Sequence, residues 1–351
     1  MSQAERYRKQ RNWGARILEY TYQGMRTVFL ENEQLRIGIL VDKGTDLFEF
    51  TYKPQDQDFI WLSPGGVRNP TSYLSTSPDP LATFLDAYPG GWQEIVPNGG
   101  APSSYLGAHF GQHGEVSNLP WDYRILEDTE EQVAVIFTVR LQKVPFAVEK
   151  TLRLRSGERC LSIEEVLVNE SDIPLRAMWG HHITFGQPFL DEHCSIRLPE
   201  QITVHSHPTP IHPQGRRVNG NKLYSWPFVE GVDGGLIDLS RMPSRGTISE
   251  IVYLSGFQQG WYEIFNQRKG LGLRVEWDAQ TMPYLWFWQE FGASHGYPWY
   301  GRAYTIGLEP FSSHPTDGIA QAVANETALV LAPRQQQHFS CQACVIEPEP
   351  K

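Results

Sequence analysis

Apolar and polar residues alternate with a period of two from one end of the 351-residue chain to the other. This alternation is typical of strands with one face in the core. It predicts a first strand from Leu35 to Val41, a second from Phe48 to Tyr52, and further strands over 133–141, 150–154 and 161–168. We therefore predict hairpins whose core-facing side chains include Leu35, Ile37, Val135, Phe137, Leu152 and Leu154.

Helical periodicity is scarce. Only short stretches near 81–87 and 317–324 are compatible with helical turns, and 31 glycines and 25 prolines punctuate the remainder. Many strands without alternating helices favour an all-β sandwich or barrel over a doubly wound sheet. No repeat of fixed period is visible, which disfavours a propeller. Residues 206–246 form a Pro/Gly-rich excursion that we expect to wall a binding site.

The composition narrows the class of protein. A hydrophobic content of 40% supports a large core, and the formal net charge of -10, with no run of Lys or Arg, disfavours nucleic acid and anionic membranes as partners. The first twenty residues are charged throughout and lack the apolar core of a secretory signal, and no later stretch approaches the length of a membrane span. We expect a cytoplasmic protein without a membrane partner.

The chain has four cysteines, which are too few for a disulfide framework in a chain of this length. Cys341 and Cys344 form a CxxC within an apparent terminal strand. A zinc site would need two more ligands, and a redox site would need a helix after the first cysteine. We therefore expect neither a metal nor a cofactor.

Three segments carry titratable residues within apolar context, where a plain core strand would not. The first, DAYPGGWQEIVPNGG with GAHFGQHGEVSNLPW, contains Asp86, Trp92, Glu94, Asn98, His109, His113 and Glu115. The second, NESDIPLRAMWGHHITFG, places His181 and His182 between Trp179 and Phe185. The third, LWFWQEFGASHGYPWYGRAYTIGLEPF, contains Trp286, Trp288, Gln289, Glu290, His295 and Glu309.

Each segment also has a purely structural interpretation. A histidine beside aromatic residues is more often a hydrogen-bonded core residue than a catalyst, and a tryptophan cluster is more often packing than a sugar platform. Glu309 departs from this expectation, because it interrupts the apolar run AYTIGLEPF. A carboxylate there is costly to bury unless it is paired, hydrogen-bonded or exposed in a cleft.

In order and character these segments resemble the aldose 1-epimerase family of the galactose mutarotase-like superfamily, over roughly residues 30–345. The motifs that carry the resemblance are Gly90-Gly91 with Pro97-Asn98, His113-Gly114, Asn169 to Pro174 leading to His182 and Phe185, and Glu309-Pro310. The opening strands, LRIGILVDKGTDLFEF, are also similar. One departure is that Gly99 and Gly100 follow Asn98, where galactose-active members place an arginine.

The resemblance implies a fold and a set of roles. The fold would be a large antiparallel β-sandwich, the galactose mutarotase-like supersandwich, as a single domain over 30–345 with residues 1–29 as an extension packing on or near it. Glu309 would be the general base, His182 the general acid, and His113 a contact near the ring oxygen. Mutarotation needs such a pair, each with a pKa near neutral, and no redox cofactor.

Sugar binding needs an apolar ring face and planar polar groups in a concave site. Trp92, Trp288, Asn98 and Gln289 are the candidates for these contacts. The expected partner is a small carbohydrate, bound by a monomer or homodimer.

Two other functions fit parts of the same sequence. One is a non-catalytic sugar-binding or sugar-sensing protein on the same fold. The other is a cupin-like metal enzyme that uses His109, His113 and Glu115 with His181 or His182. The close His-x-His of cupins is missing from that motif, which disfavours the metal enzyme.

Overall fold

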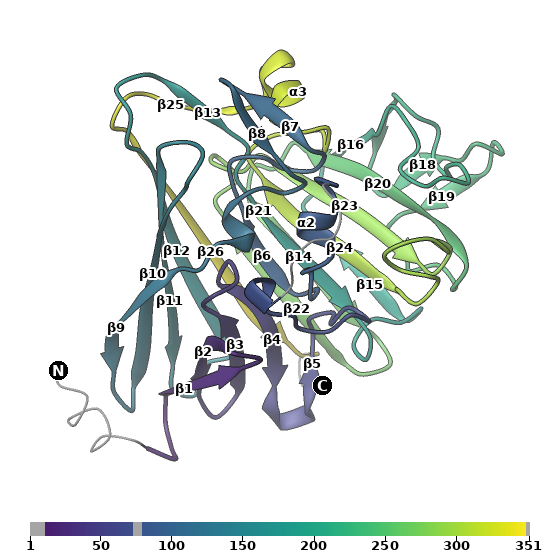
Figure 1. Ribbon diagram of the computed structural model, residues 1–351. Helices are drawn as coiled ribbons and strands as arrows, with labels where there is room; N and C mark the ends of the chain where they lie inside the picture. The colour runs from purple at the N-terminus through teal and green to yellow at the C-terminus, as the bar shows by residue number, and fades with distance from the viewer. Residues whose placement is uncertain (1–10, 73–78, 349–351) are drawn as a thin grey trace.

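The computed structural model describes residues 11–72 and 79–348 and consists almost entirely of antiparallel strands (Figure 1). Two large sheets pack face to face and share one hydrophobic core. The predicted all-β sandwich is therefore confirmed. None of the helices in the described ranges has the length or apolar character of a membrane span.

The larger sheet has twelve strands in the order β1-β2-β3-β4-β6-β14-β24-β23-β20-β16-β17, with β5 paired to β4. Their bounds are β1 Arg16–Tyr22, β2 Met25–Glu31, β3 Leu35–Leu40, β4 Asp46–Tyr52, β5 Gln57–Asp58, β6 Trp92–Ile95, β14 Gly180–Gly186, β16 Thr203–Ser206, β17 Leu223–Ser225, β20 Thr247–Ser255, β23 Tyr284–Phe291 and β24 Thr305–Phe311. The strand β1 and most of β2 lie in the predicted extension 1–29, and the two strands form one edge of this sheet. Residues 1–10 of that extension lie outside the described residues, and the division at residue 30 stays a prediction.

The second sheet has eight strands in the order β15-β21-β22-β26-β12-β11-β10-β9. Their bounds are β9 Asp122–Asp128, β10 Gln132–Arg140, β11 Phe146–Arg155, β12 Cys160–Asn169, β15 Cys194–Arg197, β21 Gly260–Asn266, β22 Leu271–Trp277 and β26 Gln336–Ile346. A disulfide joins Cys160 of β12 to Cys344 of β26, and these residues are direct partners in the ladder. Cys344 thus pairs across the sheet and not within its CxxC motif, a pairing that the sequence did not predict.

The remaining elements are short. They comprise the strand pairs β7 Ser103–Tyr105 with β8 Ala108–Phe110, β13 Leu175–Ala177 with β25 Leu329–Leu331, and β18 Phe228–Glu230 with β19 Leu236–Asp238, the 3-10 turns η1 Lys53–Gln55, η2 Pro70–Ser72 and η3 Val116–Asn118, and the helices α2 Ala82–Leu85 and α3 Ile319–Ala324. Both helices fall in the two stretches that the sequence predicted as helical turns.

The hairpins predicted from the alternating pattern are present. The pairs β3–β4, β10–β11 and β11–β12 are antiparallel, and the six predicted core side chains are fully buried. Alternation places one set of side chains from every strand in the layer between the sheets. By the same rule, the other side chains of the large sheet lie on its opposite face. Neighbouring residues on one strand can therefore lie in different environments.

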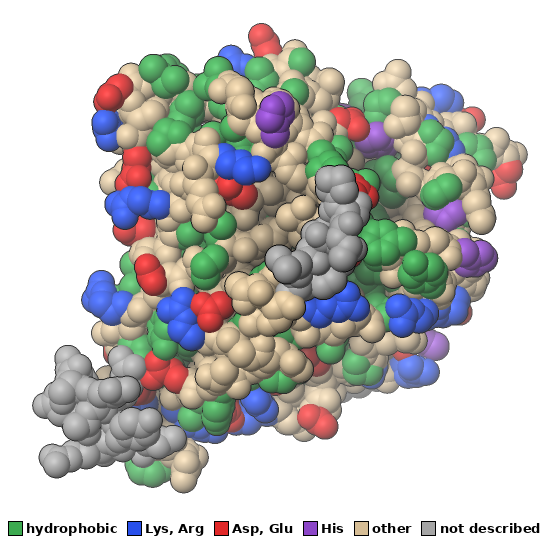
Figure 2. Space-filling view, viewed as in Figure 1, with side chains coloured by type: hydrophobic (Ala, Val, Ile, Leu, Met, Phe, Trp, Pro, Cys, Tyr) green, Lys and Arg blue, Asp and Glu red, His purple; other side chains and the backbone are tan. Residues whose placement is uncertain are grey.

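The surface agrees with the charge argument. On the face shown in Figure 2, acidic and basic side chains are interspersed, and no basic tract runs across the molecule. The Pro/Gly-rich excursion contributes β17 to the sheet edge, and its pair β18–β19 projects from the sandwich (Figure 1). That this excursion walls a binding site stays a prediction.

Candidate functional site

His182 and Glu309 lie side by side on the face of the large sheet that points away from the second sheet. The ladder between β14 and β24 pairs Gly180 with Phe311 and Thr184 with Gly307, and this register sets His182 opposite Glu309. The Nε2 of His182 is 3.5 Å from Oε1 of Glu309, and their side chains are 7% and 2% exposed. Two residues separated by 127 positions therefore form one recessed acid–base pair.

His113 joins this pair from the loop between β8 and η3. Its imidazole ring centroid lies 5.1 Å from that of His182. Its backbone is left-handed (φ 48°), an uncommon conformation that is held on both sides by Gly100. The N–H of His113 donates to the carbonyl of Gly100 (3.0 Å), and the N–H of Gly100 donates to Nδ1 of His113 (3.1 Å). A neutral His113 ring therefore carries its proton on Nε2, as a donor.

Aromatic rings surround the three residues. Phe84 of α2 packs against both histidines, and Trp288 of β23 lies 6.1 Å from His182 between ring centroids. The hydroxyl of Tyr88 is 3.4 Å from Nδ1 of His182, and Trp299 packs on both Tyr88 and Trp288. The sequence argument missed Phe84, Tyr88 and Trp299, although the last two lie inside the segments that it singled out.

Burial sets the protonation of the group. It raises the pKa of Glu309 well above its usual range. Burial also lowers the pKa of His182 to about 3; a backbone hydrogen bond opposes this shift, and the nearby positive charge of Lys43 adds to it. It also lowers the pKa of His113 well below its usual value, and the charge of His182 adds to the effect. Burial therefore favours the neutral form of each of the three side chains.

The structure does not bring the remaining predicted sugar contacts to this cluster. Trp92 points between the two sheets and donates from Nε1 to Nδ1 of His181 at 2.8 Å. Gln289 accepts a hydrogen bond from Arg217. The amide of Asn98 donates to the carbonyls of Ala101 and Gly111 and accepts the N–H of Ile319. Of the predicted ring-face and amide contacts, Trp288 alone adjoins the pair.

The departure at Gly99 and Gly100 has a steric cause. A Cβ on Gly99 would come within 2.9 Å of Phe311 and 3.1 Å of Trp286, two rings that stack on each other. A Cβ on Gly100, whose φ is +76°, would meet the carbonyl oxygen of Thr316 at 1.9 Å. Neither position accommodates the arginine of galactose-active proteins unless neighbouring atoms shift.

The other flagged polar residues are engaged elsewhere. Glu290 accepts hydrogen bonds from Ser249 and Ser294, and Glu115 accepts the backbone N–H groups of Gln142 and Lys143. His109 bonds to the hydroxyl of Ser104 at the surface. In the described ranges, His109, His113 and Glu115 do not form a group of closely spaced metal-type ligands.

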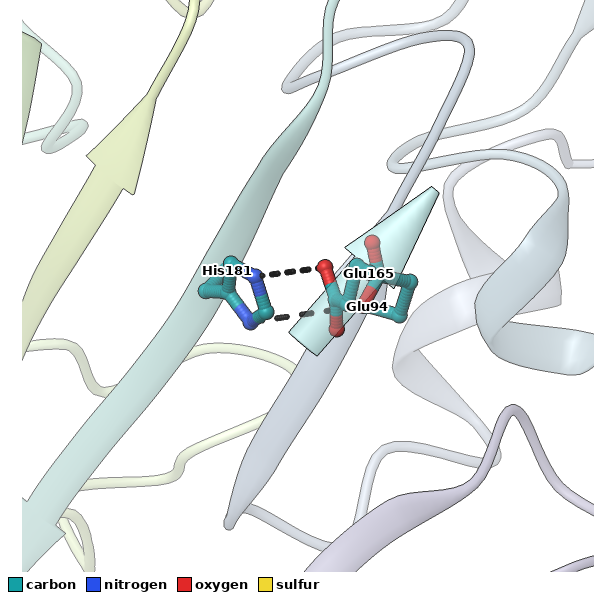
Figure 3. Close-up of side chains that lie close together, drawn as sticks. All are labelled: Glu94, Glu165 and His181. Carbon is teal, nitrogen blue, oxygen red and sulfur yellow. Dashed lines mark hydrogen bonds and ion pairs between the residues drawn. The ribbon is translucent and has the colours of Figure 1, made fainter. Parts of the chain in front are cut away.

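His181, the neighbour of His182 on β14, faces the opposite way into the layer between the sheets (Figure 3). Its Nε2 is 3.1 Å from Oε2 of Glu165 on β12, and Glu94 of β6 lies beside it. Because Trp92 donates to Nδ1, the ring proton sits on Nε2 and is donated to Glu165. Both nitrogens of His181 are thus used within the protein.

Glu94 and Glu165 share their buried position with a lysine. Lys150 of β11 is 2% exposed, and its Nζ lies 3.5 Å from Oε2 of Glu94. Burial, followed by the charge of Glu165, raises the pKa of Glu94 to about 7. One protonated carboxyl would make the set of two carboxylates and one lysine neutral.

In the described ranges, Glu94, Glu165 and His181 are also the one group of three metal-type ligands, with one atom from each within a mutual 4.8 Å. The ammonium of Lys150 already stands against Glu94, and both nitrogens of His181 have partners. A cation would have to displace these contacts. We interpret the group as an internal charge network, which the sequence argument missed because its members come from four strands.

Comparison with solved structures defines the class of fold. A candidate aldose 1-epimerase from Klebsiella pneumoniae superposes with a TM-score of 0.72 at 16% identity, over 94% of this chain and 83% of the other. A galactose mutarotase-like protein from Clostridium acetobutylicum gives 0.64 at 12% identity, over 95% and 99%. A candidate aldose 1-epimerase from Escherichia coli K12 gives 0.58 at 14% identity, over 95% and 100%. The chain therefore has the galactose mutarotase-like fold that the sequence resemblance implied.

A match to a family model gives a narrower classification of the chain than the fold does. Residues 22–216, which are 195 of the 351 residues, match the family described as a domain of unknown function, DUF4432. The chain belongs to this family. No curated protein matches the sequence.

Proposed function

We propose that this protein is an isomerase of the aldose 1-epimerase type, which interconverts the α and β anomers of an aldose. The observation that carries the proposal is the convergence of Glu309, His182 and His113 on one face of a galactose mutarotase-like sheet. Several solved proteins with this fold are named as candidate aldose 1-epimerases or as a candidate mutarotase. Their names support a sugar as the ligand of this chain as well.

The charge state of the pair suits the reaction. Burial penalises charge on both Glu309 and His182, so the pair is expected to hold a single proton. That proton can reside on the carboxyl, with a neutral imidazole, or on the imidazole, with a carboxylate. The two arrangements correspond to the states before and after ring opening.

In ring opening, the carboxylate of Glu309 takes the proton of the anomeric hydroxyl as the C1–O bond to the ring oxygen breaks. The imidazolium of His182 gives its proton to that oxygen, which leaves an aldehyde, a carboxylic acid and a neutral imidazole. Rotation about C1–C2 presents the other face, and reclosure returns both protons. His113, with its proton on Nε2, donates a hydrogen bond to a sugar oxygen.

The test is anomer exchange measured by proton NMR across a panel of aldoses. Glu309→Gln keeps the shape of the side chain but cannot accept the anomeric proton, so the exchange rate should fall by about 10²- to 10⁴-fold. Sugar affinity, measured by calorimetry, should change little, because the lost interaction belongs to the transition state.

Glu290→Gln is the matched control, because Glu290 is also a buried carboxylate of the large sheet but hydrogen-bonds to Ser249 and Ser294. Full activity of Glu309→Gln would place the base elsewhere. If the unmodified protein binds an aldose without accelerating exchange, it is a sugar-binding protein on the same fold.

A further inference from the structure

A small cavity of about 130 Å³ lies behind two aromatic residues that surround the His182–Glu309 pair, although neither His182 nor Glu309 lines it. It shares two residues with the surroundings of that pair, because Tyr88 contacts His182 and Trp299 packs on Trp288. Ligand pockets usually begin at roughly 300 Å³. The cavity is therefore suited to a substituent of a sugar bound at the pair and too small for a second sugar ring.

Two arginines, Arg68 and Arg302, are among the residues that line this cavity, and both are exposed at the surface. Arg68 donates from Nε to the carbonyl of Gly65 (3.3 Å) and from Nη1 to the carbonyl of Asp86 (3.2 Å), so two backbone contacts fix its position. A Cβ on Gly65 would lie 3.1 Å from its Nη2, so the glycine leaves room for the guanidinium. In the part of the chain that the structure describes, no hydrogen bond or ion pair involves the guanidinium of Arg302.

One carboxylate, that of Asp86, also lines the cavity, and it accepts a hydrogen bond from the hydroxyl of Tyr297 at 2.6 Å. Two arginines against one aspartate leave the cavity with a formal charge of +1, in a chain whose net charge is -10. A local positive charge in an acidic protein favours a small anion. Guanidinium groups bind phosphate with paired, charge-assisted hydrogen bonds.

We propose that the substrate is a phosphorylated aldose whose phosphate monoester occupies the cavity between Arg68 and Arg302. The inference rests on the proposed function, because it assumes that the sugar ring lies at His182 and Glu309. The anomeric carbon must then lie between these two residues. The phosphate would be carried by the exocyclic carbon, which projects from an aldopyranose ring. This site would also supply a cationic ligand contact in a protein that has glycine, and not arginine, at position 99.

The first experiment measures binding without chemistry. A 1,5-anhydrohexitol 6-phosphate keeps the ring and the phosphate but has no anomeric hydroxyl, so its affinity does not depend on whether the protein is an isomerase. By calorimetry it should bind about 10- to 100-fold more tightly than the unphosphorylated anhydrohexitol, as expected for hydrogen bonds to a charged group. Equal affinities would overturn the proposal.

Arg302→Gln should reduce the preference for the phosphorylated ligand by about tenfold or more. Arg334→Gln, which removes an exposed charge paired with Asp172 and distant from the cavity lining, should leave the preference unchanged. If the preference for the phosphorylated ligand survives in Arg302→Gln, the phosphate binds elsewhere. If the preference falls equally in Arg334→Gln, the effect is due to net charge. Strong phosphate-dependent binding without anomer exchange would support the cavity and refute the isomerase, so the two proposals fail separately.

Discussion

Two histidines that are adjacent in sequence differ in their hydrogen-bond partners. His181 points between the sheets, and both of its nitrogens have hydrogen-bond partners, Trp92 and Glu165. His182 points to the other face, and its contacts with Tyr88 and Glu309 are long, at 3.4 and 3.5 Å. Both rings are buried and both have lowered pKa values. Burial and a lowered pKa are thus common to both residues. The candidate catalytic histidine differs from the structural one because the protein leaves part of its hydrogen-bonding capacity unused.

The same substitution at both positions tests this distinction between His181 and His182 most directly. His182→Asn should lower the exchange rate by about 10²- to 10⁴-fold with little effect on stability. His181→Asn should cost about 1–3 kcal/mol of unfolding free energy, because it leaves the buried Trp92 N–H without its acceptor, while the folded protein keeps its rate within a few-fold. NMR exchange and urea denaturation of both variants provide the measurements. The reverse pattern would exchange the roles that we assign to the two residues.

The charge network around His181 provides the next test. Lys150→Met removes the positive charge that offsets the charge of the two buried carboxyl groups. The free energy of unfolding should therefore fall by about 3–5 kcal/mol. Lys222→Met is the control, since Lys222 pairs with Glu230 at the surface and should contribute at most about 1 kcal/mol. Urea titrations of the two variants give the comparison. Equal effects would contradict the view that Lys150 holds the network together.

The pH dependence of the network follows from Glu94. Its pKa of about 7 in the folded protein lies above its usual value, so the stability it contributes is fully present below that usual value and is lost as pH rises through 7. Glu94→Gln stays neutral and retains the shape of the acid. Between pH 5 and pH 8 its stability relative to the unmodified protein should therefore improve by about 1–3 kcal/mol.

Denaturation at both pH values measures this difference. His181, whose own pKa is lowered to about 4, titrates in both proteins, so to a first approximation its contribution cancels. A difference that is independent of pH would mean that Glu94 is ionised throughout this range.

The smallest expected effect concerns Trp288, one of the aromatic residues around His182. Trp288→Leu removes a ring that lies against His182 and could cover the apolar face of a sugar. Sugar affinity should weaken by about 2- to 10-fold, the usual contribution of such a contact. Trp261→Leu on β21 of the second sheet is the control and should leave affinity unchanged in the calorimetric titration. Equal affinities for the two variants would remove Trp288 from the site.

Much of the fold was predictable because a two-residue period has a local cause. Alternation at Val135, Phe137, Leu152 and Leu154 records which face of each strand is buried, whatever the partner strand is. The motifs around His113, His182 and Glu309 were also recognisable, through the family resemblance. The role of each of these residues stays a prediction, as do the cytoplasmic location, the single domain over 30–345 and the oligomeric state.

The direction of each side chain was harder to predict. Trp92 and His182 lie in similar polar and aromatic segments, yet Trp92 enters the layer between the sheets and His182 does not. Only the phase of the alternation along each strand separates the two outcomes, and turns and irregular ladders shift that phase. The register between β14 and β24 then decides that His182 meets Glu309.

The all-β sandwich, its hairpins and the apolar side chains of its core could be predicted from the sequence, because these features depend on local periodicity. The tertiary structure alone decided that Lys150 and Glu165 join Glu94 inside the sandwich, that Cys160 pairs with Cys344, and that two arginines lie beside Tyr88. Each of these groupings joins residues from strands or loops far apart in the chain. Their proximity depends on strand order and register, which no local pattern records.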